Sequence, residues 1–384
     1  MGGGAKLLGV GVVTALGRGK EVNVRALKSG FGLFRTCLLE GFEEPLQLPY
    51  LSAANTAFDE TSALDHLEDM LEAAVSEAFS DIELSPETRQ NLPLFIGSSS
   101  YGIGVGEERY KKALDQGSEA VPLPLDGFTQ VTNYLRRRFS LLGPDFAYNT
   151  ACTSSANALL DAAASIEAGH HRYALVVGIE TYNRTTLAGF HGMQLLATDA
   201  MKPFDKFRQG LVLGEGCGVL LLKAGDMRTG GVSISGGASR CDTFSISASN
   251  PDGSQIARVM GEALKSSGLH SSDIRSIKAH GTGSPLNDNG EAAGMRRLFD
   301  QVPPFFSMKA YIGHTLGACG AIETALMTAC LTAGQLPASA GFECPDESLG
   351  VEPITRAESA GPGSYMLNFF GFGGNNCSLL LRCH

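Results

Sequence analysis

The stretch FAYNTACTSSANALLDAAA, residues 146–164, decides the fold class of this chain. Residues 146–149 form a short apolar run that predicts a strand, and the alanine- and leucine-rich segment 153–168 predicts a helix. A strand that turns directly into a helix is the building unit of an α/β fold. The turn between the two holds a cysteine, Cys152, at the predicted start of the helix.

The same alternation of apolar runs and helical segments continues on both sides of this stretch. Further strands are predicted over residues 7–13, 94–98, 173–178, 218–223, 232–236, 274–280, 305–308, 365–369 and 377–381. Further helices are predicted over residues 62–79, 128–139, 256–267, 288–299 and 318–333. Strands that alternate with helices imply an α/β fold whose sheets are covered on both faces.

Two halves, residues 1–225 and 226–384, have a similar order of predicted elements. Each half opens with an apolar, glycine-containing strand, 8–12 or 232–236, and closes on a pair of apolar strands. The seam at 225–231 interrupts the pattern with polar residues and three glycines. This order suggests a duplicated unit, while the lack of a period of about 20–50 residues argues against a solenoid.

The composition predicts a large core and argues against nucleic acid as a partner. Of the 384 residues, 43% are hydrophobic and 18% are charged, below the roughly 25% charged residues of a typical globular protein. The 48 glycines follow no collagen-like period and predict tight turns and close backbone contacts. A net charge of −10 is the opposite of the basic excess that nucleic-acid-binding proteins carry.

The cysteine usage predicts a reducing compartment. The nine cysteines are odd in number and form neither a CxxC pair nor a Cys/His cluster with zinc spacing. No apolar run is long enough to span a membrane, and the N-terminus has no secretory signal pattern. We therefore expect a cytoplasmic protein without a membrane span or a metal site.

Cys152 is the candidate nucleophile. The unpaired N–H groups and the dipole of a helix N-terminus favour an anion, so we expect the pKa of this thiol to be lowered. A tight strand-to-helix turn also exposes the side chain at its tip. On position alone, a buried structural cysteine is an equally good interpretation, and it is the one we assign to the other eight cysteines.

Two histidines follow predicted strands, each between glycines. His280 lies in AHGTGSP (279–285) and His314 in KAYIGHTLGA (309–318). Open α/β sheets bind ligands at the carboxyl ends of their strands, and the glycines let a substrate approach the backbone. Acid–base or hydrogen-bonding work is favoured over a metal site because no further ligand cluster is present. Either histidine alone could be a structural residue.

Two glycine-rich segments complete the set of motifs. GFGGNN (371–376) lacks the Lys-Ser/Thr ending of a phosphate-binding loop and precedes a strand, so its N–H groups are better oxyanion donors than a phosphate cradle. A wide hairpin turn is the alternative. GEGCG (214–218) predicts close packing of strands, with Glu215 in a structural ion pair.

Together these motifs resemble the β-ketoacyl-acyl-carrier-protein synthases, the decarboxylating Cys-His-His branch of the thiolase superfamily. The resemblance covers nearly the whole chain. It rests on TACTS (150–154), PFD (203–205), GEG (214–216), AHGT (279–282), Lys309 with GHTLGA (313–318), and NFFGFGGNN (368–376). It implies a thiolase-like fold of duplicated βαβαβαββ halves in five layers, αβαβα, usually assembled as a dimer.

The resemblance also implies the reaction. Cys152 would take the acyl group from a carrier-protein thioester, which splits the condensation into two easier steps. His280 and His314 would polarise the malonyl thioester carbonyl and promote decarboxylation, because two neutral imidazoles stabilise the resulting enolate. The implied activity is that of a 3-oxoacyl-[acyl-carrier-protein] synthase in fatty acid, polyketide or aryl polyene elongation.

Three further residues gain roles from the resemblance. Lys309 would be the family's active-site lysine and Glu323 its supporting carboxylate. The backbone N–H groups of Cys152 and Phe372 would form the oxyanion hole, and the Phe372 ring would gate the substrate. No bound cofactor or metal is implied, because phosphopantetheine would arrive attached to the acyl carrier protein.

The substrate pocket and the docking surface are expected at more variable positions. Phe190 and Met193 would line the acyl tunnel near Cys152. Gly106 falls where related enzymes place a bulky residue across that tunnel, so a longer or stiffer chain would fit, unless another side chain fills the gap.

A compact basic triplet, Arg136, Arg137 and Arg138, precedes the nucleophile strand. In the family this helix helps to receive the acidic acyl carrier protein, and a basic patch on an acidic chain suits that partner. Cations that merely complement the carboxyl end of a helix are the alternative.

Several departures from the family pattern bear on the substrate. The usual Lys-Ser-Met-Thr-Gly-His is KAYIGH (309–314), the usual Gly-Thr-Asn is GNN (374–376), and Gln209 replaces a common Asp. Tyr311, Ile312 and Asn375 therefore argue against a standard fatty-acid substrate. The segments 280–288 and 368–376 resemble synthases that accompany bacterial aryl polyene pathways.

Two other functions remain open at this point. A chain-length subunit would shape the tunnel of a catalytic partner, but such subunits typically lose the nucleophile that Cys152 supplies. The other is a thiolase or a Cys-His-Asn initiating synthase that uses coenzyme A thioesters. His314 in GHTLGA argues against the Cys-His-Asn type, and a thiolase would need a second catalytic cysteine, for which Cys377 is near enough to require a check. The sequence leaves undecided the acyl chain, the particular carrier, and the choice between a homodimer and a heterodimer with a related subunit.

Overall fold

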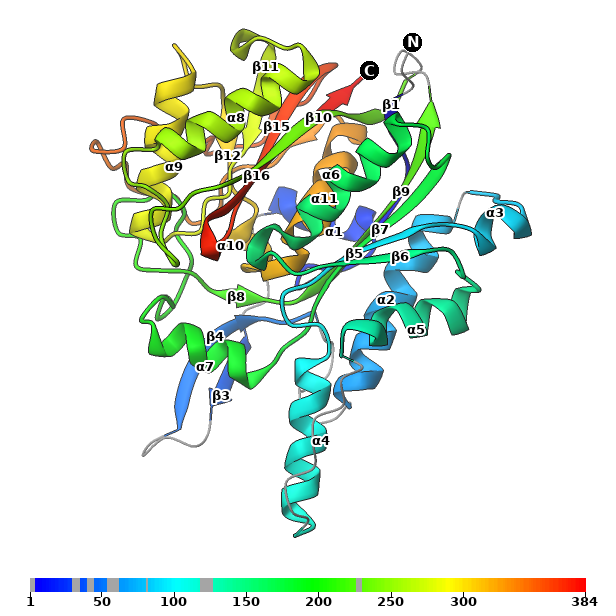
Figure 1. Ribbon diagram of the computed structural model, residues 1–384. Helices are drawn as coiled ribbons and strands as arrows, with labels where there is room; N and C mark the ends of the chain where they lie inside the picture. Colours follow the sequence, from blue (N-terminus) through cyan, green and yellow to red (C-terminus); the bar gives the residue numbers. More distant parts are fainter. Residues whose placement is uncertain are drawn as a thin grey trace.

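The computed structural model describes residues 4–29, 35–39, 45–53, 62–80, 82–117, 127–225 and 230–384 (Figure 1). All the predicted strands and helices are present in it, with their ends shifted by a few residues. The strands are β1 (Gly4–Thr14), β2 (Gly17–Arg18), β3 (Arg35–Leu39), β4 (Leu46–Leu51), β5 (Leu94–Gly97), β6 (Asp145–Tyr148), β7 (Tyr173–Glu180), β8 (Leu213–Gly214), β9 (Gly216–Gly225), β10 (Val232–Cys241), β11 (Ile274–Lys278), β12 (Phe305–Phe306), β13 (Gln335–Leu336), β14 (Glu358–Ser359), β15 (Gly363–Phe370) and β16 (Asn375–Cys383).

Some of the helices were not predicted. The helices are α1 (Lys20–Ser29), α2 (Ala63–Phe79), α3 (Pro86–Gln90), α4 (Ile103–Asp115), α5 (Gly127–Phe139), α6 (Ser154–Glu167), α7 (Arg184–Gly192), α8 (Ser254–Ser267), α9 (Pro285–Leu298), α10 (Lys309–Ile312) and α11 (Cys319–Thr332). The prediction missed α1, α3, α4, α7 and α10. Of these, α4 and α7 each bury only two residues, and so lack the apolar stripe of a core helix.

One long sheet contains two copies of the same strand arrangement. In the first half the order is β6-β5-β7-β9-β1, and in the second half it is β12-β11-β15-β16-β10. In each copy the first three strands of this order are parallel and the last two pair antiparallel. The two copies join where β1 pairs with β10 at Ala5↔Ile234 and Lys6↔Ser233. The topology is therefore duplicated, as the similar halves suggested.

The hydrophobic core shows how the layers are stacked. One cluster fills the centre and contains residues of α6 and α11 with the facing sides of both sheet halves. A second cluster packs α2 on the outer face of the first half, and a third packs α8 and α9 on the outer face of the second half. Three clusters between helices and sheets give the five αβαβα layers. The residue division 1–225 and 226–384 stays a prediction, since residues 226–229 lie outside the described range.

The central layer depends on a close contact between α6 and α11, which lie side by side between the sheet halves (Figure 1). Every residue of α11 except Thr332 is buried. A Cβ atom on Gly320 would lie 2.1 Å from the backbone nitrogen of Ala156, so only glycine lets the two helices meet at this point. No helix among the described residues is long and apolar enough to cross a membrane.

Replacing Gly320 tests this contact. Gly320→Ala should destabilise the protein by about 1–3 kcal/mol or more, because the methyl group meets backbone rather than a flexible side chain. Gly189→Ala is the matched control, since nothing lies within 4 Å of its Cβ position on α7. Urea unfolding would measure both variants, and equal stability of the two would contradict the close-contact interpretation.

Candidate active site

Cys152 lies in a strained turn between β6 and α6. The strand ends at Tyr148, a short 3-10 turn covers Ala151–Thr153, and α6 begins at Ser154. Ala151 has a φ of 52°, a left-handed conformation that costs energy for a residue with a side chain. The turn is held by Ser154, whose Oγ donates to the Ala151 carbonyl at 2.6 Å and accepts from the Thr150 N–H at 3.0 Å. The chain thus uses local strain to present Cys152.

The predicted lowering of the Cys152 pKa is wrong. Burial raises the pKa of this thiol to about 11, and the Phe372 N–H and the charge of Lys309 oppose this rise only in part. The helix dipole lowers the pKa less than burial raises it, because Cys152 precedes the first residue of α6 and is almost fully removed from water. The resting nucleophile is therefore a thiol, and its proton must leave as the sulfur attacks.

The glycine-rich loop reaches the nucleophile from the end of β15. The backbone N–H groups of Phe372 and of Cys152 itself both donate toward the Cys152 sulfur. A Cβ atom on Gly371 would lie 3.3 Å from the Cys152 nitrogen, which explains the glycine at this place. Two N–H groups that converge at the reacting atom can stabilise an oxyanion. The oxyanion role of this loop stays a prediction.

Asn375 fastens that loop to the nucleophile helix. Its Oδ1 accepts a hydrogen bond from the Thr153 hydroxyl at 2.6 Å and another from Asn157 Nδ2 at 2.9 Å. Its carbonyl accepts from the Gly371 N–H at 2.8 Å. The departure from the family pattern at this position therefore has a structural use: it connects segments that are more than 200 residues apart in the sequence.

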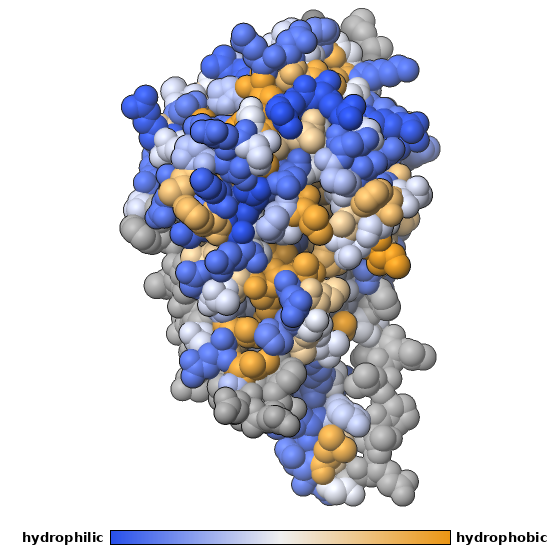
Figure 2. All heavy atoms as spheres, turned by 90° about the vertical axis from the view of Figure 1, so that its left-hand side faces the viewer, coloured by the Kyte–Doolittle hydropathy of each residue, from blue (hydrophilic) through white to orange (hydrophobic). Residues whose placement is uncertain are grey.

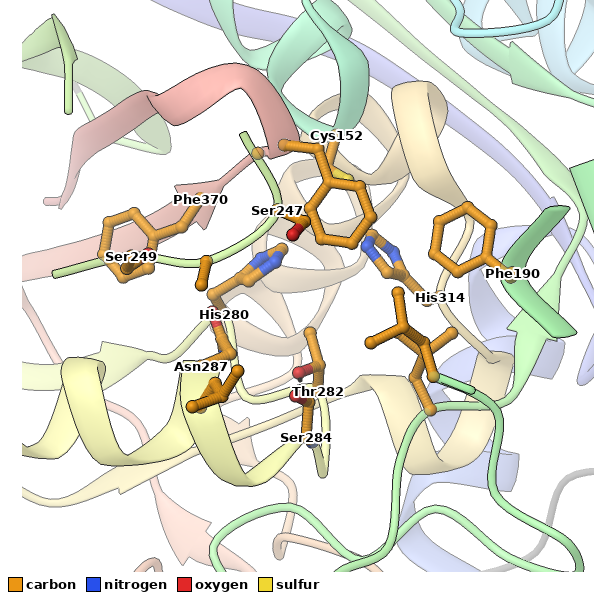
Figure 3. Close-up of a pocket in the computed structure, with 16 residues that line it drawn as sticks. Cys152, Phe190, Ser247, Ser249, His280, Thr282, Ser284, Asn287, His314 and Phe370 are labelled. Atoms are coloured by element: carbon orange, nitrogen blue, oxygen red, sulfur yellow. Dashed lines mark hydrogen bonds between the residues drawn. The ribbon is translucent and has the colours of Figure 1, made fainter. Parts of the chain in front are cut away.

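His280 and His314 meet beside Cys152. Their rings lie 5.3 Å apart between centroids and are nearly perpendicular, at 83°. Burial and the charge of Lys309 lower the pKa of both rings well below its usual range, so both imidazoles are neutral. The Leu316 N–H donates to Nδ1 of His314 at 3.2 Å, which places the ring proton on Nε2. Figure 3 shows both rings and Cys152 directed into the same pocket.

Two carboxylates that the sequence analysis did not single out hold the His280 turn. Glu291 accepts from the backbone N–H groups of His280 and Gly281, both at 2.8 Å. Asp288, one turn earlier on α9, accepts from the N–H groups of Thr282 and Gly283. Burial raises the pKa of Glu291 to about 7. The sequence signal that could have identified these two carboxylates is their spacing of three residues on a helix that follows the AHGTG turn.

Lys309 and Glu323 form the expected pair, and a second lysine joins them. Lys309 Nζ donates to Glu323 Oε1 at 2.7 Å, and both side chains are completely buried. Lys278, the last residue of β11, contacts the other oxygen of Glu323 and is buried as well. The sequence analysis placed Lys278 in a strand and did not single it out.

The pocket in front of these residues is a cavity of about 50 Å³. Cys152, His280 and His314 lie at its inner end (Figure 3). The rings of Phe190 and Phe372 are stacked at 5.5 Å and 11° across it. Its mouth is lined by residues 247–249 and by Ser284, Leu286 and Asn287. A volume of this size is too small to hold an acyl chain.

Two of the four predicted substrate-binding residues, Phe190 and Phe372, line this cavity. Met193 directly follows α7 with 49% of its surface exposed and is not among the lining residues. Gly106 lies on α4, also away from the cavity. This cavity does not include an acyl tunnel, so the tunnel role of these two residues stays a prediction. Cys377, on β16, does not line the cavity either.

The basic triplet on α5 is paired within the chain. Arg136 contacts Asp145, Arg137 contacts Glu68, and Arg138 contacts Glu72. Figure 1 places α5 on the opposite side of the molecule from α9, which borders the pocket mouth. The triplet therefore has little uncompensated charge, and the pocket geometry gives its docking role no support.

Comparison with protein families identifies the group. The family described as "Beta-ketoacyl synthase, N-terminal domain" matches residues 52–227, and "Beta-ketoacyl synthase, C-terminal domain" matches residues 232–343. The chain belongs to the β-ketoacyl synthase family. The matched regions contain Cys152, His280 and His314, and the Cys152 turn and the Phe372 loop of this synthase meet at one point.

Named relatives agree in length with this synthase. It is 29% identical over 416 residues to a 3-oxoacyl-[acyl-carrier-protein] synthase 2 of Rhizobium meliloti, covering 98% of both chains. It is 28% identical over 326 residues to that of Vibrio cholerae, covering 79% of this chain and 78% of the relative.

Solved structures are similar over the whole chain. One is a chain of the complex between a ketosynthase (ApeO) and its chain length factor (ApeC) from Xenorhabdus doucetiae, with 26% identity, a TM-score of 0.86, and coverage of 100% and 98%. Another is a β-ketoacyl synthase from Burkholderia phymatum, with 25% identity, a TM-score of 0.83 and full coverage of both chains. These likenesses bear out the thiolase-like fold of this synthase.

The pKa of Cys152 predicts how its alkylation depends on pH. Because the pKa is raised to about 11, the thiolate fraction and the alkylation rate should rise about tenfold per pH unit from pH 6 to 9 without a plateau. Peptide mapping after iodoacetamide pulses would measure it, with the exposed Cys241 as an internal reference. A plateau near pH 7 would show a thiolate and overturn this assignment.

Proposed function

We propose that this synthase is the condensing subunit of a carrier-protein-dependent elongation system. The observation that carries the proposal is the convergence of Cys152, His280 and His314 on one cavity. An acyl group bound to Cys152 would have its carbonyl oxygen beside two backbone N–H groups, and a malonyl thioester would face two neutral imidazoles. These are the parts that a decarboxylative Claisen condensation requires.

Acyl transfer begins with the buried thiol. Sγ of Cys152 bonds to the thioester carbonyl carbon while the N–H groups of Cys152 and Phe372 donate to the developing oxyanion. The bond to the carrier's sulfur then breaks, and that sulfur takes up the proton that the thiol gives away. Because burial keeps Cys152 protonated, proton transfer and attack have to occur together, with a neutral imidazole able to relay the proton.

Condensation then uses the histidines as donors. The bond between the malonyl α-carbon and its carboxylate breaks, carbon dioxide leaves, and the electron pair forms an enolate at the thioester. Nε2–H of His314 is oriented for donation to the enolate oxygen because Nδ1 is already an acceptor. The enolate carbon bonds to the acyl carbonyl carbon, and the Cys152 sulfur leaves as a thiolate that takes up one proton from solvent.

The acyl chain requires the aromatic stack to open. Phe190 and Phe372 close a cavity of only about 50 Å³, and Phe372 lies in a loop whose Gly373 has a φ of 77°. We infer that Phe372 moves with this loop when a chain enters, which agrees with the gating role that the family resemblance implies.

A carrier protein is the proposed partner, and its phosphopantetheine arm is the proposed occupant of the mouth. Apolar residues gather along the middle of the face that carries α7 and α9 (Figure 2). Ile246 is 84% exposed, and its carbonyl accepts from the Gly373 N–H at 2.6 Å, so it borders the loop of the site. Leu286 lines the mouth and is also exposed. No further cofactor is proposed.

A heterodimer with a chain length factor is the proposed assembly, with a homodimer as the alternative. Its support is the similarity to a chain of the ApeO–ApeC complex. The same similarity favours one competing function, that of a chain length factor itself. The complete set of Cys152, His280 and His314 favours the condensing role. The aryl polyene placement and the cytoplasmic location stay predictions.

Intact-mass analysis after incubation with acyl-loaded carrier proteins tests the function. We expect a mass gain of one acyl group on the wild type and none on Cys152→Ala. His314→Ala should still be acylated but should lose malonyl decarboxylation by at least about 100-fold, since an enolate donor is missing. The acyl chain that loads best would indicate the length of the acyl tunnel. No acylation with any chain, alone or with a partner subunit, would favour the chain length factor.

Carrier docking can be tested on the two competing surfaces. Ile246→Glu should raise KM for the carrier-bound substrate several-fold, because it removes apolar contact and repels an acidic carrier. Joint replacement of Arg136, Arg137 and Arg138 by Ala should change KM less than twofold, since all three are already paired. The reverse result would place the carrier on α5.

A further inference from the structure

Lys278 is a buried cation that the proposed mechanism leaves without a role. It ends β11, two residues before His280, and its side chain has no exposed surface. Lys309 already supplies the partner that Glu323 needs, so a second lysine on the same carboxylate is not required for pairing. Burying a further ammonium group is costly unless its hydrogen bonds are met, which makes this residue worth explaining.

The surroundings of Lys278 suit a protonated amine. Its Nζ contacts an oxygen of Glu323, donates to the Asn368 carbonyl at 2.7 Å, and lies 3.7 Å from the centroid of the Phe369 ring. An ammonium group has three donors and no acceptor, and these three neighbours are all electron-rich. A neutral amine would direct its lone pair at one of them. The geometry therefore selects the charged form.

The cluster consequently carries one unbalanced positive charge. Lys278 and Lys309 bring two charges, and Glu323 brings one of opposite sign. Burial lowers the pKa of Lys278, Glu323 opposes this, and the charge of Lys309 adds to the lowering. The charge of Glu323 outweighs burial at Lys309 and raises its pKa. As a pair, the lysines hold one proton firmly and the second more weakly.

The positive charge of the Lys278–Glu323–Lys309 cluster acts on both histidines. Lys309 and Lys278 act on the rings of His280 and His314, and each ring also faces the other. The other titratable groups at the rings are Cys152, a neutral thiol, and Glu291, which bonds the His280 backbone and is half protonated near pH 7. Among the described residues at the rings, the Lys278–Glu323–Lys309 cluster is thus the main source of fixed positive field.

We propose that Lys278 is a positioning residue for the decarboxylation step, whose surplus charge keeps His280 and His314 neutral as hydrogen-bond donors. The inference rests on the proposed function. An imidazolium would hold the malonyl carboxylate as an ion pair and oppose its loss, whereas a neutral ring donates to the thioester oxygen where the charge arrives. Lys278 acts through the histidines and does not touch the substrate.

The pH dependence of malonyl decarboxylation by Lys278→Met tests the proposal. Removing one positive charge makes the imidazolium forms less unfavourable, so the pKa values of the rings rise and activity is lost at a higher pH. We expect the acidic limb to move up by about one pH unit, the effect of one charge within about 10 Å at an effective dielectric constant of about 20. Lys265→Met, on the exposed end of α8, is the control and should leave the limb unchanged.

Three comparisons separate charge from packing. Lys278→Gln should shift the limb as Lys278→Met does, whereas Lys278→Arg should keep it at the wild-type pH even if kcat falls. A merely structural role would lower kcat in all three variants without moving the limb, and that result would overturn the inference. If Lys278→Arg fails to fold, an unmoved limb in the two neutral variants still overturns it. Wild-type enzyme that does not decarboxylate malonyl thioesters would instead contradict the proposed function.

Discussion

The contact between α6 and α11 is the constraint on which the active site depends. The two helices occupy equivalent places in the duplicated halves and cross so closely that Gly320 touches the Ala156 backbone. Cys152 immediately precedes α6, and His314 immediately precedes the turn that begins α11. Because the helices are aligned at the same end between the sheet halves, their preceding loops meet. The Ala321 N–H, which donates to the Ser155 hydroxyl at 2.9 Å, and the Cys319 thiol, which donates to the Cys152 carbonyl at 3.0 Å, fix that alignment.

Burial sets the electrostatics of the site. Removal from water raises the pKa of Cys152 and lowers those of His280 and His314, so all three groups are neutral before substrate arrives. The charges of the two lysines and Glu323 lie behind them, and the polar donors are backbone N–H groups held by the fold. Such a site contains no reactive ion before the reaction. Its fixed dipoles are directed at the places where negative charge develops during the reaction.

Residues with a recognisable local setting were predictable, and residues defined by distant neighbours were not. Cys152, His280, His314 and Phe372 occur in glycine-rich or small-residue turns at element ends, and the structure brings them together. Met193 does not line the cavity, and its predicted place in an acyl tunnel depends on a space that is not open in this structure. The arginines of α5 form ion pairs with carboxylates on α2 and β6, and a local sequence pattern does not predict such pairs.

By itself, the sequence determined the α/β alternation, the duplicated order of strands, the glycines that permit close contacts, and the residue types of the site. These features follow from local periodicity and turn chemistry, which act over a few residues. Only the tertiary structure decided the protonation state of Cys152, the closed aromatic stack and the sharing of Glu323 by Lys278 and Lys309. Those properties depend on burial and on charges from strands and helices far apart in the chain, and solvent exclusion exists only once the layers have packed.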